Sequence, residues 1–177
     1  SIREEAETAV REGSTFIILS DKNISNQKAS IPSILTVGAV HSHLVKHGLR
    51  GYCSLNVECS DAMDTHSFAI LIGVGATTVN PYLAIDSIYQ RFEKKLFGKS
   101  DFETCISKFK KSIDAGLLKI MSKMGISVIS SYRGGCNFEA VGLSRAIVSD
   151  YFPGMSSRIS GIGIIGIEKK IKELHEK

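Results

Sequence analysis

The chain has 177 residues, of which 43% are hydrophobic and 23% are charged, and its formal net charge is +4 at pH 7. This size and composition are ordinary for one globular domain with a real core. Polar or charged residues interrupt every apolar run, which excludes a transmembrane helix, and the modest positive charge permits an anionic partner without requiring one.

The N-terminal residues, 1–7, are acidic and helical in character, so they show neither the basic start nor the apolar segment of a signal peptide. They contain no initiator Met, and we expect the true start to lie upstream. The four cysteines, at positions 53, 59, 105 and 136, form no CxxC pair. Their spacing indicates neither a zinc ribbon nor a disulfide framework, and we expect reduced thiols in a cytoplasmic protein.

The first strand–helix unit comes after a predicted helix over residues 2–12, which Gly13 ends. Residues 15–20 are apolar and rich in β-branched side chains without alternation, which predicts a strand buried on both faces, as in a parallel sheet. After a polar loop, Pro32 stands in the first turn of a helix that extends to about His47.

The second and third units repeat this plan. Residues 52–58 predict a strand, and Asp61 is positioned to cap the helix that follows it. Residues 77–79 predict a third, short strand. The Asn80-Pro81 turn then starts a helix over residues 82–97.

The strongest helical pattern covers residues 100–124, where apolar side chains recur every three or four positions. Ser100 and Glu103 have the spacing of a capping box at its start. Residues 126–129 are apolar and β-branched, and they predict a fourth strand.

A turn at residues 131–135 leads into a predicted helix near Phe138, and a last amphipathic helix covers residues 164–173. The alternation of strands and helices predicts an α/β fold with parallel strands and right-handed crossovers. About four strands flanked by helices are half of an eight-stranded barrel, which typically needs about 250 residues. We therefore predict a single domain over residues 1–177 with an incomplete or half TIM-barrel-like fold. Open sheet edges predict either self-association, which would make a homo-oligomer, or coverage of the edges by a helix.

Functional side chains in parallel α/β folds lie at the carboxyl ends of the strands. Just after the second strand, Asp64 and His66 have the chemistry of an acid–base pair, although helix capping and surface hydrogen bonding explain them equally well. No nucleophile accompanies them in the sequence, so we predict no catalytic residue. Four loops occupy the strand-end position, at residues 20–21, 58–61, 80–81 and 130–136.

The glycine-rich turn in the last of these loops is the candidate anion site, formed by Arg133, Gly134, Gly135 and Cys136. Backbone amides before a helix attract negative charge, and the guanidinium group adds to the attraction. A tight turn that needs glycine, with Cys136 as a small packing residue, is the preferred interpretation, because two glycines are a weak phosphate signature.

The histidines raise the question of a metal site. His43 and His47 are four residues apart and share a helix face, whereas His41 points elsewhere and His66 belongs to the next helix. Zinc needs a third convergent ligand, which the sequence does not show, so we predict no metal site. A group of lysines is interpreted as a solvated helix face rather than a nucleic-acid patch, since few aromatic residues lie among them. These are Lys94, Lys95, Lys99, Lys108, Lys110 and Lys111.

Longer stretches carry more specific information than these motifs. These stretches are REGS (11–14) and IILSD (17–21), VGAVHSHL (37–44) and HGLR (47–50), HSFA (66–69) and NPYLA (80–84), and GLLKIMSKMGIS (116–127). FEAVGL at 138–143 and SRI at 157–159 continue the series. In this order they resemble the central domain of the large subunit of glutamate synthase over nearly the whole chain. The chain departs from the usual family pattern at Ser42, Ser67 and Cys136, where the family usually has His, His and Gln.

The resemblance implies an enzyme that releases ammonia from glutamine and adds it to 2-oxoglutarate. Electrons from NADPH or ferredoxin reach the product through FMN and an iron–sulfur cluster. In the family, the glutaminase nucleophile is a cysteine on a separate domain, and a downstream barrel domain holds both cofactors. Neither domain is contained in this chain, so the resemblance implies no cofactor within it.

This chain resembles the C-terminal part of the central domain, an incomplete barrel of the type found in FMN-linked oxidoreductases. The resemblance implies a structural connector between the glutaminase and FMN domains that helps to frame the ammonia path, with no nucleic-acid or membrane partner. The alternatives are an autonomous α/β module that binds a small anion at residues 131–136 and a stand-alone enzyme that uses Asp64 and His66.

Overall fold

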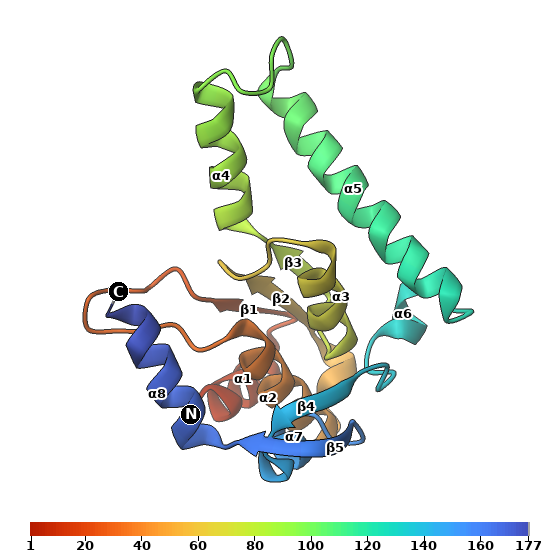
Figure 1. Ribbon diagram of the computed structural model, residues 1–177. Helices are drawn as coiled ribbons and strands as arrows, with labels where there is room; N and C mark the ends of the chain where they lie inside the picture. Colours follow the sequence, from red (N-terminus) through yellow and green to blue (C-terminus); the bar gives the residue numbers. More distant parts are fainter. Residues whose placement is uncertain (177) are drawn as a thin grey trace.

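The computed structural model describes residues 1–176, in which five strands form two parallel sheets flanked by helices (Figure 1). Strands β1 (Phe16–Ser20), β2 (Ser54–Glu58) and β3 (Thr78–Asn80) form one sheet in the order β1-β2-β3. Strands β4 (Glu139–Leu143) and β5 (Ser156–Ile162) form the other. The described residues form no closed barrel, so the predicted incomplete, barrel-like α/β fold is confirmed.

The helices connect and flank the strands. No helix among residues 1–176 is both long enough and apolar enough to cross a lipid bilayer. The helices are α1 (Ile2–Arg11), α2 (Ser33–Lys46), the 3-10 helix η1 (Arg50–Tyr52), α3 (Thr65–Gly73), α4 (Tyr82–Glu93), α5 (Phe102–Lys123), α6 (Ile129–Tyr132), α7 (Arg145–Tyr151) and α8 (Ile164–His175).

The three-stranded sheet is covered on one face only. Ile17 and Leu19 of β1 are buried, whereas the alternate side chains Phe16 and Ile18 are 71% and 67% exposed. The prediction that β1 is buried on both faces is therefore wrong. The helices of this chain that contact β1 and β2 pack against the Ile17 face, and no described residue covers the other.

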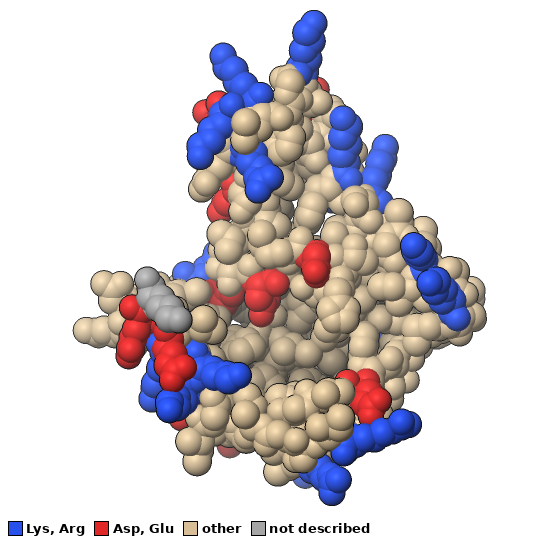
Figure 2. Space-filling view, in the orientation of Figure 1, with Lys and Arg blue, Asp and Glu red and all other residues tan. Residues whose placement is uncertain are grey.

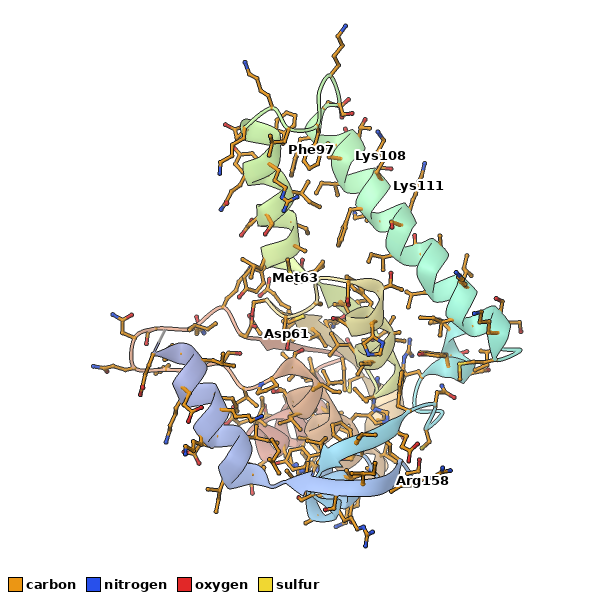
Figure 3. All side chains as sticks on the ribbon, viewed as in Figure 1. Asp61, Met63, Phe97, Lys108, Lys111 and Arg158 are labelled. Carbon is orange, nitrogen blue, oxygen red and sulfur yellow. The ribbon has the colours of Figure 1, made fainter. Side chains whose placement is uncertain are left out.

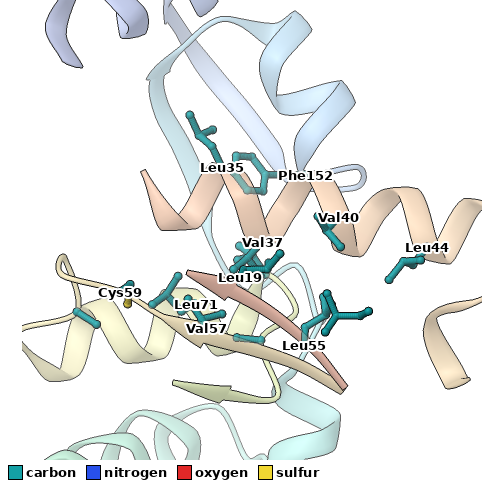
Figure 4. Packing of buried hydrophobic residues seen from close by; sticks show 14 of the residues in the cluster. Leu19, Leu35, Val37, Val40, Leu44, Leu55, Val57, Cys59, Leu71 and Phe152 are labelled. Atoms are coloured by element: carbon teal, nitrogen blue, oxygen red, sulfur yellow. The ribbon is translucent and has the colours of Figure 1, made fainter. Parts of the chain in front are cut away.

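Helix α2 is the centre of the core, because it packs against the sheet on one side and α7 on the other (Figure 4). Val37, Val40 and Leu44 of α2 and Leu55 of β2 have no exposed surface. Gly38 allows the α7 side to approach closely, since a Cβ atom there would lie 2.4 Å from a ring carbon of Phe152. The predicted helix over residues 32–47 is confirmed at its centre and nearly at both ends.

Helices α4 and α5 form a long hairpin that projects from the sheet (Figure 1). Helix α5 contacts α3 through Phe109, whose ring lies edge-on to Phe68 at 6.4 Å, and through Gly116, where a Cβ would meet Thr65 at 2.5 Å. All six lysines of the predicted solvated face are exposed, at the hairpin tip and along α5 (Figure 2). Lys108 and Lys111 point away from the body of the molecule (Figure 3).

Two predicted helix starts are displaced. Helix α3 begins at Thr65 rather than near Asp61, and the Asp64 carboxylate caps it by accepting a hydrogen bond from the Ser67 amide at 2.8 Å. Asp61 instead accepts hydrogen bonds from Ser33 at the start of α2, from its amide at 3.0 Å and its hydroxyl at 2.5 Å. Pro32, the N-cap residue of α2, has no side chain that can accept a hydrogen bond. Asp61, which follows β2, therefore caps α2 instead.

The N-cap of helix α5 also lies one residue later than predicted. Asp101, not Ser100, is the N-cap, and its carboxylate accepts a hydrogen bond from the Thr104 amide at 2.6 Å. Helix α4 ends at Glu93, four residues before the predicted end at 97, because the chain turns through Lys95, which has a φ of 56°.

The C-terminal third differs most from the prediction. Residues 126–128 form no strand, because the Ile126 amide closes α5 by donating to the Met121 carbonyl at 3.0 Å. The region of Phe138 starts β4 rather than a helix, and β5 was not predicted. Both errors have one cause: β4 and β5 contain glycines at a close backbone approach, where a Cβ on Gly161 would lie 2.1 Å from the Gly142 carbonyl oxygen.

Candidate functional site at the strand ends

The carboxyl ends of β1, β2 and β3 meet in a hydrogen-bonded polar cluster centred on Glu58. Its carboxylate accepts hydrogen bonds from the Ser20 hydroxyl at 2.8 Å and the Asn80 amide at 3.2 Å, and pairs with the Lys22 ammonium at 2.7 Å. The Lys22 ammonium and the Ser20 hydroxyl hold the pKa of Glu58 below its ordinary value. Glu58 is therefore a satisfied anion and a poor general base.

A second carboxylate, Asp21, lies beside this cluster. One of its oxygens accepts hydrogen bonds from the Ser60 amide at 2.9 Å and the Ser60 hydroxyl at 2.7 Å. Burial raises the pKa of Tyr82, and the nearby Asp21 carboxylate raises it further. A cavity of about 240 Å³ opens next to these strand ends and is lined in part by Ser20, Asp21 and Glu58.

Cys59 follows Glu58 directly but lacks the properties of a nucleophile. Burial raises the pKa of the Cys59 thiol to about 12, and the Asp61 carboxylate raises it further. A thiol with this pKa is protonated at neutral pH, whereas thiolate is the reactive form. The hydroxyl groups of Ser20 and Ser60 donate to the carboxylates of Glu58 and Asp21, so each of these serines helps to hold a carboxylate in place.

The uncovered face of the sheet changes from apolar on β1 to polar on the neighbouring strands β2 and β3. Phe16 and Ile18 lie at its apolar part, and Asn56, Glu58, Thr78 and Asn80 form the polar part. The Thr78 hydroxyl donates to the Asn56 side-chain oxygen at 2.6 Å. In a closed barrel the face opposite the helices is the inner face, so these residues would line the barrel interior.

His41 joins a buried polar group rather than a metal site. The Arg50 guanidinium donates to its Nδ1 at 3.0 Å, and to the backbone carbonyls of Cys53 at 2.6 Å and Gly75 at 2.9 Å. Burial lowers the pKa of His41 to about 4, and the positive charges of Arg50 and Arg133 contribute. His41 is therefore neutral at pH 7 and serves as an acceptor that holds Arg50 in place.

His43 and His47 share a face of α2, as predicted, and the structure adds a residue that the sequence pattern did not identify. Helix α1 places Glu7 beside them, with its carboxylate 2.7 Å from Nε2 of His43 and 3.9 Å from Nε2 of His47. The three side chains form a group with metal-ligand chemistry. Glu7 lies 36 residues before His43, so no local spacing could have revealed it.

Several hydrogen-bond donors of the candidate anion site at residues 133–136 already donate to backbone carbonyls. The amide of Gly134 donates to the Gly73 carbonyl at 2.8 Å, and that of Gly135 donates to the Tyr132 carbonyl at 3.2 Å. Nε of Arg133 donates to the Ala76 carbonyl at 3.1 Å. The segment turns tightly, and Gly134 has a φ of 70° and Cys136 a φ of 51°.

Among the described residues, the side chains of Asp64 and His66 form no hydrogen bond with each other. Asp64 uses its carboxylate to accept from Ser67, while His66 is exposed on α3. The amide and hydroxyl of Ser67 lower the pKa of Asp64. This geometry assigns Asp64 to helix capping, the alternative that the sequence left open.

Comparison with known proteins identifies the family of this chain. The family model for the glutamate synthase central domain matches residues 1–144. The chain belongs to the glutamate synthase central domain family. It is 59% identical over 174 residues to the glutamate synthase [NADPH] large chain of Azospirillum brasilense, covering 98% of this chain and 12% of that protein.

Two further relatives, one NADPH-linked by name and one ferredoxin-dependent by name, extend this comparison. The chain is 42% identical to the glutamate synthase [NADPH] large chain of Bacillus subtilis (strain 168) over 98% of this chain and 11% of that protein. It is 40% identical to a ferredoxin-dependent glutamate synthase of Pyropia yezoensis over 98% of this chain and 12% of that protein. The chain thus spans about an eighth of the length of these relatives or less.

Proposed function

We propose that this chain is a structural segment of a glutamate synthase, which makes L-glutamate from L-glutamine and 2-oxoglutarate with electrons from NADPH or ferredoxin. The observation that carries the proposal is the 59% identity to an NADPH-dependent large chain over 98% of this chain. Catalysis then belongs to the glutaminase and FMN domains, and the whole enzyme acts in the cytoplasm. This segment, residues 1–177, contributes one piece of the domain between them.

The residues of this chain do not fit the cofactors of the whole enzyme. Iron–sulfur clusters are held by converging cysteine thiolates, and no three cysteines come together among the described residues. The glycine turn at residues 134–135 could not cradle the FMN phosphate in its present form, because its amides already donate to backbone carbonyls. Both groups are therefore assigned to other segments, and no reaction step is assigned to this chain.

The role proposed for this segment follows from its uncovered sheet face. Phe16 and Ile18 expose an apolar surface that a neighbouring domain of the same enzyme would bury. Beside it, Asn56, Glu58, Thr78 and Asn80 present hydrogen-bonding groups. Ammonia is small and polar, so a polar strand face next to a buried domain contact is suited to frame part of its path.

The test uses the full-length glutamate synthase that contains this segment, together with the isolated 177-residue chain. Ile18→Lys places a charge on the uncovered sheet face, and Leu118→Lys is a matched control because Leu118 of α5 is 65% exposed and Ile18 is 67% exposed. We expect Ile18→Lys to lower glutamine-dependent glutamate formation and thermal stability in the full-length enzyme. The stability of the isolated chain should hardly change, because the side chain is exposed there.

Two results would overturn the proposal. The first is an Ile18→Lys full-length enzyme with unchanged activity and melting temperature. The second is turnover of glutamine and 2-oxoglutarate by the isolated chain, since this would place the catalytic groups within residues 1–177.

A further inference from the structure

Glu7, His43 and His47 are brought together by the packing of α1 against α2. One carboxylate oxygen of Glu7 and the two Nε2 atoms all lie within 4.8 Å of one another. Two imidazoles and a carboxylate are a frequent ligand set for Zn²⁺, which binds them at about 2.0–2.2 Å. To meet these distances, the Glu7 carboxylate and Nε2 of His43, now 2.7 Å apart, would separate slightly, and Nε2 of His47, now 3.9 Å from the carboxylate, would move closer.

We infer that Glu7, His43 and His47 form a binding site for a divalent transition metal, with Zn²⁺ as the preferred ion. Zn²⁺ favours imidazole nitrogen over the all-oxygen shells preferred by Mg²⁺ and Ca²⁺. Three protein ligands leave a fourth position for water or for a donor group from elsewhere in the enzyme. This inference is independent of the proposed role in glutamate synthase.

Two neighbouring contacts orient the ligands. Nδ1 of His47 lies 2.8 Å from the His43 carbonyl oxygen, so this nitrogen carries the proton and Nε2 presents its lone pair. Arg11 donates to the other oxygen of Glu7 at 2.8 Å and fixes the carboxylate plane. Supporting hydrogen bonds from the second ring nitrogen to a carbonyl are a regular feature of metal-bound histidines.

The three side chains are accessible to an ion from solvent and lie close enough together to bind the same ion. The side chains of Glu7, His43 and His47 are 21%, 18% and 35% exposed, so an ion from solvent reaches them without unfolding. The imidazole rings of His43 and His47 lie with their centroids 4.2 Å apart. A bound ion would link α1 to α2, and because the unfolded chain lacks this geometry, binding would stabilise the folded state.

The experiment measures Zn²⁺ binding by the chelator-treated 177-residue chain, by calorimetry and by the melting temperature, with Mg²⁺ as the comparison ion. Glu7→Gln keeps a hydrogen-bond acceptor for His43 but removes the anionic ligand, and His47→Ala removes a half-exposed ligand. We expect Zn²⁺ to raise the melting temperature and Mg²⁺ to leave it unchanged. Each variant should bind Zn²⁺ about tenfold more weakly or worse, since even loss of a supporting group costs about that much.

Control variants separate this site from other metal-binding groups. His66→Ala removes an exposed histidine on α3, and Cys136→Ser removes the exposed thiol; both should bind Zn²⁺ like the parent chain. Co²⁺ serves as a spectroscopic probe and should give the visible bands of a nitrogen and oxygen site without a thiolate charge-transfer band. No Zn²⁺ binding, unchanged binding in Glu7→Gln and His47→Ala, or a thiolate band lost in Cys136→Ser would each overturn the inference.

Discussion

A substitution at Gly38 is the most direct test of how closely α2 packs between the sheet and α7. A Cβ atom at this position would lie 2.4 Å from Cε1 and 2.8 Å from Cδ1 of Phe152, and 2.8 Å from the Tyr151 carbonyl oxygen. Non-bonded carbon atoms prefer separations of about 3.5–4.0 Å. Phe152 is only 6% exposed and one contact is to backbone, so neither neighbour can move away without disturbing the core.

We therefore expect Gly38→Ala to destabilise the chain. Overpacking of a core costs about 1–3 kcal/mol. Alanine recovers about 0.5–1 kcal/mol by its higher preference for a helix interior. With three contacts under 3 Å, the cost of overpacking lies toward the upper end of its range, and the net loss should be about 2 kcal/mol. For a chain of this size, such a loss lowers the melting temperature by about 4–8 °C.

The assay is urea denaturation of the 177-residue chain, followed by circular dichroism, with the melting temperature as a second readout. Gly51→Ala is the matched control, because a Cβ there would have no neighbour within 4 Å. It should change the free energy of unfolding by no more than about 0.5 kcal/mol.

A double-mutant cycle with Phe152→Leu checks the cause of the loss. The smaller side chain makes room for the new methyl group, so Gly38→Ala should cost at least about 0.5 kcal/mol less in the Phe152→Leu background. The reasoning is refuted if Gly38→Ala is as stable as the parent chain. Additive losses in the cycle would also refute it, because they would show that the methyl group does not meet the Phe152 ring.

Three further predictions follow from the capping, titration and thiol geometry. Asp61→Ala should cost about 0.5–2 kcal/mol, because it leaves the Ser33 amide without its cap, whereas Asp86→Ala on the exposed face of α4 should be nearly neutral in the same urea titration. Burial lowers the pKa of His41 from 6.5 to about 4, so between these values the unfolded chain binds more protons and stability falls as the pH falls. Unfolding free energies measured at intervals from pH 7 to about pH 4 should show a shallower fall in His41→Gln than in His66→Gln, and parallel profiles would contradict the assignment. Alkylation of the native chain, followed by mass spectrometry, should modify the exposed Cys136 first and Cys59 last, since burial raises the pKa of the Cys59 thiol to about 12; early modification of Cys59 would contradict its buried placement.

Much of the N-terminal half could be predicted from the sequence because its signals are local. The β-branched run at residues 15–20 and the proline and glycine that bound α2 depend only on neighbours along the chain, and these elements are confirmed. The same kind of signal failed at Ile126, where β-branched residues found no neighbouring strand and the backbone closed α5 instead. A strand needs a partner, and local composition does not say whether one is present.

The strand–helix alternation of the N-terminal half, the parallel α/β class and the family could all be predicted from the sequence. Which face of β1 is covered, which helix Asp61 caps, and the meeting of Glu7 with His43 and His47 depend on how the elements pack. These contacts join residues that are distant along the chain. Periodicity and capping act over a few residues, whereas Ser33 and Asp61 are 28 residues apart and Glu7 and His43 are 36 residues apart. The sequence identifies the thiol and imidazole groups themselves. Packing sets which groups lie beside them, and these neighbours shift their pKa values and supply further ligands.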